Sequence, residues 1–382
     1  IIASMQGPLP YTKVESGQYS VGYDNEEAAW KAMIDDLNYS IDVLTSLMNT
    51  DPSFNELTTE DRIYQGDYKK WIKFANSLKL RIAIRISNAV PEYAQEIAEK
   101  AVAHPYGVMD SNDCDAYDNI GSTNFKNGLA SVNSWGEVRA NACIVSFMNG
   151  YGDPRREAYF TKTTVSPDYE YLGVRSGISG ITTGMFSTYS TVKVETKTPM
   201  LIFNAAEVAF LRAEGALKGW TMGGIAEEFY KKGIQLSFNE HSISGADTYI
   251  ANSINVPADY ICPLNSAYNY TNPCKLPVAW NPATTTSAKE ENLERILTQK
   301  MIANFPIGNE TWADFRRTGY PAVFPAYDNL STQGVTKERQ QRRLRFSEDE
   351  YASNGDNVTE ACSFLSNGQD TDATDLWWAK KN

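Results

Sequence analysis

Hydrophobic positions recur every three or four residues in several stretches of the chain, which is the period expected of helices with one buried face. The pattern is clearest between residues 24 and 48. Asp24 and Glu27 form a capping-box-like start to this stretch. The apolar positions that follow at helical spacing are Trp30, Met33, Ile34, Leu37, Ile41, Leu44 and Met48. We therefore predict an amphipathic helix here.

Two further helices are predicted after it. One starts near Asp67 and stops before Pro91. Its apolar positions are Trp71, Phe74, Leu78, Ile82 and Ile86. Pro91 suits the first turn of the next helix, which extends to about Ala103. We expect Arg81 and Arg85 to pair with acids of neighbouring helices rather than with a ligand.

A helical hairpin is predicted, with its first helix over residues 200–219 and its second over residues 225–240. One face of its first helix carries only small side chains, so a second helix can approach it closely. These side chains are Ala205, Ala209, Ala213 and Ala216. Gly219 is placed to end the helix, and the second helix brings Ile225, Phe229, Ile234 and Phe238 to a shared core. The pair has about the 34-residue length of one tetratricopeptide unit.

Two long stretches break the helical pattern. They are rich in Gly, Ser, Thr, Asn and Asp, and within the first only residues 136–149 follow a helical period. Helical patterns return at 290–305 and 310–317, and the tail to residue 382 has mostly coil character.

These patterns predict a single domain over residues 1–382. Its fold class is mostly α, a tetratricopeptide-like scaffold of helical hairpins. The scaffold segments are 1–105, 199–240 and 289–320, and the loop-rich insertions are 106–198 and 241–288. Irregular segments this long in a compact protein are usually functional or disordered. Their many aromatic residues favour order, so we predict that the insertions bind ligand.

Composition excludes several classes of protein. The net charge of −12 and the pI near 4.9 disfavour a nucleic-acid ligand, because phosphate backbones are held by clustered Lys and Arg. No apolar run reaches the roughly 18 residues that cross a bilayer. With only His104 and His241 and no CxxC spacing, a zinc or redox site is not expected.

Aromatic residues in the irregular stretches are the candidates for ligand contact. Sugar rings stack on Trp and Tyr, while their hydroxyls need amide, carboxylate or guanidinium partners, so we expect an exposed aromatic platform with amides nearby. The predicted ligand-binding residues are Asn133, Trp135, Arg139, Tyr171, Tyr189, Tyr268, Asn269 and Tyr270. For each one the alternative is an ordinary surface aromatic or polar residue. Helical stripes or caps hold four other tryptophans, which we expect in the core: Trp30, Trp71, Trp220 and Trp312.

The acidic residues do not form a convincing catalytic pair. Glu207 and Glu214 are seven residues apart on one helix face, which places their Cα atoms about 10.5 Å apart. Glycosidases need carboxyl groups about 5 to 9.5 Å apart. We expect these two glutamates to be buried partners for Arg212, Arg316 or Arg317.

Two loop features have alternative interpretations. An acidic cluster offers the hard oxygen ligands that calcium prefers, but it lacks EF-hand spacing and is otherwise a solvated loop. Its members are Asp110, Asp113, Asp115 and Asp118. No other cofactor is expected. Cys262 and Cys274 flank a loop that a disulfide would stabilise by about 3 kcal/mol in an oxidising compartment; two unpaired buried thiols are the alternative. We expect Arg155, in the turn Asp153-Pro154-Arg155, to tie the first insertion to the scaffold.

Five stretches, in order along the chain, resemble the SusD/RagB family of Bacteroidetes outer-membrane lipoproteins, especially its SusD-like branch. The first is residues 64–87, which opens with Tyr64-Gln-Gly-Asp-Tyr-Lys-Lys-Trp71. The others are Asp153-Pro154-Arg155, residues 205–214, residues 296–303 with 316–321, and the closing Trp377-Trp378. As an ordered set they cover nearly the whole chain, which makes the resemblance specific.

This resemblance implies a function. Members of the family bind extracellular glycans or other nutrients, cap a TonB-dependent transporter of the SusC type, and perform no catalysis. It implies a cell-surface lipoprotein of the outer membrane that binds a glycan or oligosaccharide. The opening Gly7-Pro8-Leu9-Pro10-Tyr11, followed by Tyr23-Asp24, resembles a point well inside such proteins. We therefore expect the signal peptide, the lipid-bearing cysteine and the first helices to lie outside this chain, with membrane attachment only through that lipid.

Two other classes of function stay open from the residues alone. An acidic chain rich in Tyr and Trp would also suit a glycoside hydrolase on a helical frame, although no nucleophile–base set supports one. A protein-binding repeat scaffold in the cytosol is the third class. The residues do not specify which saccharide is bound, and a peptide or another nutrient also stays open.

Overall fold

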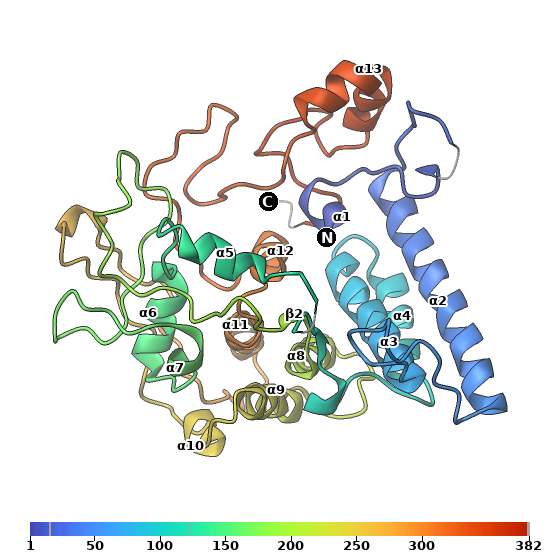
Figure 1. Ribbon diagram of the computed structural model, residues 1–382, viewed down its shortest axis with the longest axis horizontal. Helices are drawn as coiled ribbons and strands as arrows, with labels where there is room; N and C mark the ends of the chain where they lie inside the picture. Colours follow the sequence, from blue (N-terminus) through green and yellow to red (C-terminus); the bar gives the residue numbers. More distant parts are fainter. Residues whose placement is uncertain (15–16, 122, 380–382) are drawn as a thin grey trace.

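Packed helices form most of the regular structure, which confirms the predicted mostly α fold class (Figure 1). The structure is a computed structural model, and it describes residues 1–14, 17–121 and 123–379. The scaffold helices are α2 (Glu26–Thr50), α3 (Tyr68–Ile86), α4 (Pro91–Ala103), α8 (Ala205–Leu217), α9 (Ala226–Glu240), α11 (Thr286–Ala303) and α12 (Gly308–Thr318). The remaining helical elements are α1 (Ile2–Met5), η2 (Asn112–Cys114), α5 (Gly128–Ser134), α6 (Ala142–Tyr151), α7 (Arg156–Tyr159), α10 (Ala246–Ile250), η3 (Ser266–Tyr268) and α13 (Glu348–Ser363).

The scaffold helices pack as neighbouring hairpins. α3 packs against both α2 and α4, and α8 packs against both α9 and α11. α3 also contacts α8, and α12 contacts α11 and α3, so the hairpins share one continuous core. Figure 1 shows α2, α3 and α4 along one edge of the molecule, with α8, α9 and α11 beside them. In the part of the chain that the structure describes, no helix combines the length and the apolar character needed to span a membrane.

Small side chains let α8 and α9 approach closely. The alanines of α8 are buried at Ala205, Ala209 and Ala213, as predicted. On α9, a Cβ atom placed at Gly233 would lie 2.7 Å from the ring of Phe210 on α8, which is closer than real Cβ atoms approach other atoms. Glycine at this position is therefore a requirement of the helix packing. Gly219 follows α8 with a φ of +90°, as a helix-ending glycine should.

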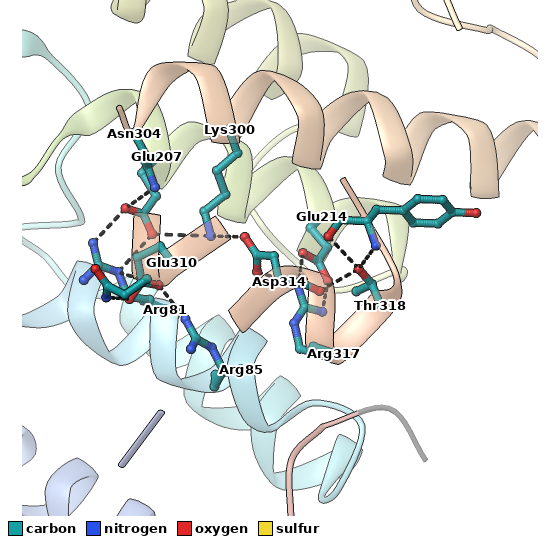
Figure 2. Close-up of polar contacts among 12 residues, drawn as sticks. Arg81, Arg85, Glu207, Glu214, Lys300, Asn304, Glu310, Asp314, Arg317 and Thr318 are labelled. Atoms are coloured by element: carbon teal, nitrogen blue, oxygen red, sulfur yellow. Dashed lines mark hydrogen bonds and ion pairs between the residues drawn. The ribbon is translucent and has the colours of Figure 1, made fainter. Parts of the chain in front are cut away.

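Buried ion pairs connect the scaffold helices (Figure 2). Arg81 on α3 donates from Nε and Nη2 to the two carboxylate oxygens of Glu207 on α8, at 2.9 and 2.7 Å. The Nζ of Lys300 on α11 lies 3.4 Å from the same carboxylate and 2.8 Å from Asp314 on α12. Because α3, α8, α11 and α12 each contribute a charge, the network fixes these four helices relative to one another.

Two more pairs extend this network. Arg317 on α12 donates to the two carboxylate oxygens of Glu214 on α8, at 2.5 and 2.7 Å. Arg85 on α3 donates to Glu310 on α12 at 2.5 Å. The expectation that the arginines of α3 pair with neighbouring helices is confirmed, and so is the Arg317 partner of Glu214. Glu207 was expected to pair with Arg212, Arg316 or Arg317, and this is wrong because the bidentate contact comes from α3.

A second buried cluster ties the first insertion to the scaffold, as predicted for Arg155. Its guanidinium is fully buried and lies 2.6 Å from the carboxylate of Asp153. It also donates to Ser237 on α9 and to Gln299 on α11, each at 2.9 Å. The start of the irregular segment after α6 is thus held against two scaffold helices.

Two short strands, β1 (Ala116–Asp118) and β2 (Met200–Phe203), form an antiparallel pair in which Tyr117 lies opposite Leu201. The sequence pattern placed the beginning of a helix over β2, which is wrong. A short apolar run has no period that separates strand from helix, and pairing with β1 decides the outcome. Helix α8 starts after Asn204, whose side chain accepts a hydrogen bond from the backbone N–H of Glu207.

Three other expectations are corrected at helix ends. Asn25, and not Asp24, caps α2, because Asp24 accepts from the backbone N–H and hydroxyl of Thr12 instead. Ile225 is 59% exposed because it is the N-cap of α9 and lies outside the apolar stripe. The tail contains α13, which the interpretation as coil missed, although Ser347 and Glu350 form a recognisable capping sequence before it.

Candidate ligand-binding site

The loop-rich segments gather on the side of the molecule away from α2. Figure 1 shows most of residues 123–199 in green and 250–285 in gold on this side, and the orange segment that follows α12 runs along its top. The chain encloses two hollows here, of about 620 and 490 Å³. They share Asn141 and Ser176, so they adjoin, and together we call them the trough. Volumes of this order are typical of small-molecule sites.

The first hollow lies between the scaffold and the segment after α12. Its base is formed by residues from the end of α11, the start of α12 and the following connection. Its polar lining is rich in side-chain amides and hydroxyls. The polar and aromatic residues that line it are Asn141, Ser176, Phe305, Thr311, Trp312, Phe324, Asn329, Thr336, Lys337, Gln340 and Gln341.

The second hollow lies between two loops of the first insertion. One wall is residues 136–139 and the other is residues 174–186, with Arg139, Arg175, Thr182, Thr183 and Phe186 among the lining residues. Asn141 connects the two hollows because it caps α6, accepting from the backbone N–H of Cys143 at 2.8 Å. Its Nδ2 donates to the hydroxyl of Ser176 at 2.9 Å, which closes the shared edge.

Trp135 is the exposed aromatic residue of this region, as the sequence predicts. It ends helix α5 and is 65% exposed. The next residue, Gly136, has a φ of +75° and lines the second hollow. Trp135 therefore adjoins the second hollow in sequence but lines neither hollow, and its indole keeps most of its surface in water, where it can stack against a sugar ring.

Asn133 and Arg139 lie on either side of Trp135 in sequence and hold its loop. Asn133 donates to the carbonyl of Val192 at 3.1 Å. Arg139 donates from Nε to the carbonyl of Phe186 at 2.7 Å and from Nη1 to the carbonyls of Gly136 and Val138, both at 2.8 Å. Arg139 also lines the second hollow, whereas Asn133 does not.

Tyr268, Asn269 and Tyr270 lie behind the trough and line neither of its hollows. The Tyr268 ring meets Tyr327 edge to face, with ring centroids 4.9 Å apart. Asn269 accepts from the backbone N–H of Cys262 at 2.8 Å. These contacts hold the gold loop against the segment after α12, so the three residues support the walls of the trough.

The guanidinium of Arg175, which lines the second hollow, joins three irregular segments. It lies 4.7 Å from the centroid of the Tyr270 ring and 5.4 Å from that of Tyr327. Its terminal nitrogens donate to the carbonyls of Tyr268 and Pro325 at 3.4 and 3.2 Å.

Tyr171 and Tyr189 were expected on an exposed platform, and this is wrong because each is only 2% exposed. The ring of Tyr189 meets Phe186 edge to face at 4.9 Å, and the guanidinium of Arg156 lies over the ring of Tyr171 at 5.2 Å. The insertions have an apolar core of their own, and a pattern search based on helical stripes could not show it.

The cysteines are unpaired. Cys262 and Cys274 are both buried thiols, so the alternative without a disulfide is the one that the structure has. The Sγ of Cys262 lies 3.3 Å from the hydroxyl of Tyr189, inside the core of the insertions.

None of the predicted ligand-binding residues lines the first hollow. Trp312 was expected in the core, but it is half-buried and lines this hollow. Its Nε1 donates to the carbonyl of Gln341 at 3.0 Å, and Arg316 covers one face of its ring at 3.6 Å. The amide-rich run that contains Gln340 and Gln341 is the signal in the sequence that could have indicated a polar wall.

A larger hollow of about 940 Å³, which we call the acidic hollow, shares Phe305, Pro306 and Ile307 with the first hollow, so the two adjoin. Asp115, Tyr117, Glu240 and His241 line it. Burial, together with the charge of Asp115, raises the pKa of Glu240 to about 8, and burial raises the pKa of Asp115 to about 6. Burial also lowers the pKa of His241 to about 4.

The two carboxylates of the acidic hollow hold the fold. Asp115 accepts from the backbone N–H of Ala205 at 2.6 Å and from Asn112 at 2.9 Å. Glu240 accepts from the hydroxyl of Tyr117 and from Asn204 at 3.0 Å. Every carboxylate oxygen of this pair already has a donor from the protein, so both acids help to hold the start of α8 and the end of α9 in place.

The acidic cluster in the sequence is not gathered around one point. Asp110 pairs with Lys73 at 2.8 Å and Asp118 pairs with Arg62 at 2.6 Å, while Asp115 faces the start of α8. Among residues 1–14, 17–121 and 123–379, no group of three or more His, Cys, Asp or Glu side chains converges as metal ligands would.

Comparison with known proteins gives one family. A model of SusD-like proteins, described as SusD and RagB outer membrane lipoprotein, matches residues 2–379. Among curated protein sequences, none matches the chain.

Several solved structures are similar over the whole chain. A SusD-like protein from Bacteroides thetaiotaomicron is 47% identical with a TM-score of 0.95, and the match covers 100% of this chain and 78% of that one. A SusD homologue from Bacteroides uniformis is 41% identical with a TM-score of 0.93 and the same coverage, 100% and 78%. A chitin-binding SusD homologue from Flavobacterium johnsoniae is 37% identical with a TM-score of 0.94, again covering 100% and 78%. These matches support carbohydrate binding at the level of the family.

Proposed function

Because the chain belongs to the SusD and RagB family of outer membrane lipoproteins, we propose that it binds a glycan in the trough at the cell surface and delivers it to a TonB-dependent transporter of the SusC type. The observation that carries this proposal is the exposed indole of Trp135, which adjoins the second hollow in sequence, together with the amides and hydroxyls among the residues that line the trough. Aromatic faces and oriented polar groups are what a sugar ring needs for stacking and for hydrogen bonds to its hydroxyls.

The protein acts as a receptor without catalysis and without a cofactor. The charges that line the trough are three cations and Glu137, so the trough offers no pair of opposed carboxylates. Glu207 and Glu214 are paired with cations inside the scaffold. In such sites, rigid helices usually position the loops that bind the ligand.

The test combines binding with product analysis. Affinity electrophoresis on a panel of polysaccharides, including chitin oligosaccharides because of the chitin-binding homologue, should show retardation without release of reducing sugar. The result should be the same with EDTA. Release of reducing sugar would favour the glycoside hydrolase, and neither binding nor release would favour a scaffold that binds proteins.

Trp135→Ala should weaken glycan binding by about 10-fold, since loss of one stacking aromatic costs roughly 1–2 kcal/mol. The matched control is Tyr39→Ala, because Tyr39 is 73% exposed on α2, outside the trough. Equal affinity of the two variants in isothermal titration calorimetry would place the glycan elsewhere on the protein. For delivery, the measurement is co-purification of this protein with a SusC-type transporter from its native outer membrane, and failure to co-purify would contradict the transporter partner.

A further inference from the structure

We propose that the trough selects glycans that carry negative charge, as a carboxylate or a sulfate group on the sugar. This inference rests on the proposed glycan-binding function and adds the class of glycan. Three observations carry it: the local charge of the trough, the missing counter-charge of Arg175, and the free donors of Arg139 and Lys337.

The trough is cationic in an acidic protein. Its charged lining residues are Arg139, Arg175 and Lys337 against a single carboxylate, Glu137. The chain as a whole has a net charge of −12. Charges of one sign that line a concave surface raise the local concentration of oppositely charged ligands.

Arg175 is buried without a counter-charge. It is 8% exposed, and no carboxylate of the described residues lies within ion-pair distance of it. Its Nε is buried and has no hydrogen-bond partner, and its terminal nitrogens make only long contacts of 3.2 to 3.5 Å with carbonyls. Burial accordingly lowers the pKa of Arg175. Buried guanidiniums of the scaffold differ, because Arg155 and Arg317 each have a carboxylate partner.

A buried cation that lacks an anion carries an uncompensated desolvation cost. The rings of Tyr270 and Tyr327 offset part of this cost through cation–π contacts. An anionic group bound in the second hollow, which Arg175 lines, would supply the missing charge. A neutral sugar would leave the cost in place.

The other two cations, Arg139 and Lys337, have N–H groups that donate to no described residue. Arg139 donates from Nε and Nη1 to carbonyl groups, and its Nη2 makes no hydrogen bond to any described residue. Lys337 is exposed in the first hollow, where its ammonium likewise donates to no described residue. The charge of Lys337 acts on Asp328, whose carboxylate already accepts from the backbone N–H and the hydroxyl of Ser179. Guanidinium and ammonium donors are strong partners for carboxylate and sulfate oxygens.

Hydroxyl groups complete the second hollow. Ser176, Thr182 and Thr183 are exposed along its wall beside Arg139. They can donate to the remaining oxygens of a carboxylate or sulfate and to sugar hydroxyls. The indole of Trp135 would stack on the ring that carries the anionic group, since it adjoins this hollow in sequence.

The experiment compares glycans that differ only in charge. Three matched pairs are titrated into the protein by calorimetry: homogalacturonan in its methyl-esterified and de-esterified forms, chondroitin and its carboxyl-reduced form, and chondroitin sulfate and its desulfated form. The first two pairs test for a carboxylate and the third tests for a sulfate. In at least one pair the more highly charged member should bind at least about 10-fold more tightly than its partner at 50 mM salt. This preference should shrink at 500 mM salt because salt screens exposed charges.

Variants locate the preference in the trough. Lys337→Gln should reduce the charged-to-neutral affinity ratio by about threefold, and Arg139→Gln by about tenfold. Lys232→Gln is the matched control, since Lys232 is exposed on α9 and lines neither hollow, and it should leave the ratio unchanged. Because Lys337 makes no hydrogen bond to the described residues, its substitution should not disturb folding, whereas Arg139→Gln needs a parallel unfolding measurement.

The outcomes separate this inference from the proposed function. Binding of neutral glycans with no preference for a charged member, or a preference that Lys337→Gln and Arg139→Gln both leave intact, overturns the inference and leaves glycan binding standing. If no glycan of the broad panel or of the matched pairs binds, both the inference and the proposed function fail.

Discussion

At the scale of single residues, Glu214 and Glu240 have opposite electrostatic environments. Burial alone would raise the pKa of Glu214, but the charge of Arg317 outweighs burial and lowers it to about 2. Burial and the charge of Asp115 raise the pKa of Glu240 to about 8. Stability should therefore depend on pH in opposite directions through these two groups.

Glu214→Gln should lower the free energy of unfolding by about 3–5 kcal/mol at pH 7, because it leaves Arg317 buried without its main partner. The native pKa of Glu214 is depressed, so its contribution is present above the unfolded value of 4.5 and is lost as the pH falls toward 2. The difference between wild type and variant should accordingly narrow between pH 4.5 and 2 in urea titrations. Glu227→Gln is the control, because Glu227 pairs with Lys231 at the surface, and it should cost at most about 0.5 kcal/mol.

Glu240→Gln should have the opposite pH dependence. The native pKa of Glu240 is raised, so its contribution is present below pH 4.5 and is lost as the pH rises to about 8. Glutamine imitates the neutral form, so the variant should gain stability relative to wild type over this range, as measured by urea unfolding. Glu228→Gln on the same helix is exposed, and it should change stability by about 0.5 kcal/mol or less. A constant difference between Glu240→Gln and wild type across the range would falsify the assignment.

At the scale of elements, helix packing explains most of the scaffold. The helical periods predicted α2, α3, α4, α9, α11 and α12 to within a few residues because each has an apolar stripe that faces its neighbours. They missed α5, β2 and α13, since a seven-residue helix and a four-residue strand are too short to show a period, and α13 has few apolar positions. Contacts with segments distant in sequence determine the structure of these elements, as the pairing with β1 does for β2.

Gly233→Ala tests the close packing of α8 and α9. Alanine improves helix propensity by about 1 kcal/mol, but its Cβ would lie 2.7 Å from the Phe210 ring, so we expect a net destabilisation of about 1–3 kcal/mol from overpacking. Gly355→Ala in α13 is the matched control, because nothing lies within 4 Å of its Cβ position; it should stabilise by about 0.5–1 kcal/mol. Both changes are measured by denaturant unfolding. If the Gly233→Ala protein were as stable as the Gly355→Ala protein, α8 and α9 could move apart without loss of stability, and the close packing would not be required.

At the scale of the whole molecule, the helices position loops that come from distant parts of the sequence. The trough combines residues 136–186 with residues 301–344, so its shape depends on tertiary packing that sequence patterns do not contain. The exposure of Trp135 and the position of Arg139 were predictable, because neither lies on a helical stripe. The burial of Tyr171 and Tyr189 was not, since the insertions form their own core. Trp312 was missed because it follows the helical stripe of α12 and yet reaches the first hollow.

The central claim is that this trough holds an unaltered glycan. A crystal structure of the protein with a bound oligosaccharide, chosen from the glycans that pass the binding panel, tests it most directly. The account predicts an intact saccharide in the trough, with one ring stacked on Trp135 and polar contacts from Arg139 or from the amides around Asn141. A saccharide bound in the acidic hollow beside Glu240, or found cleaved, would contradict it.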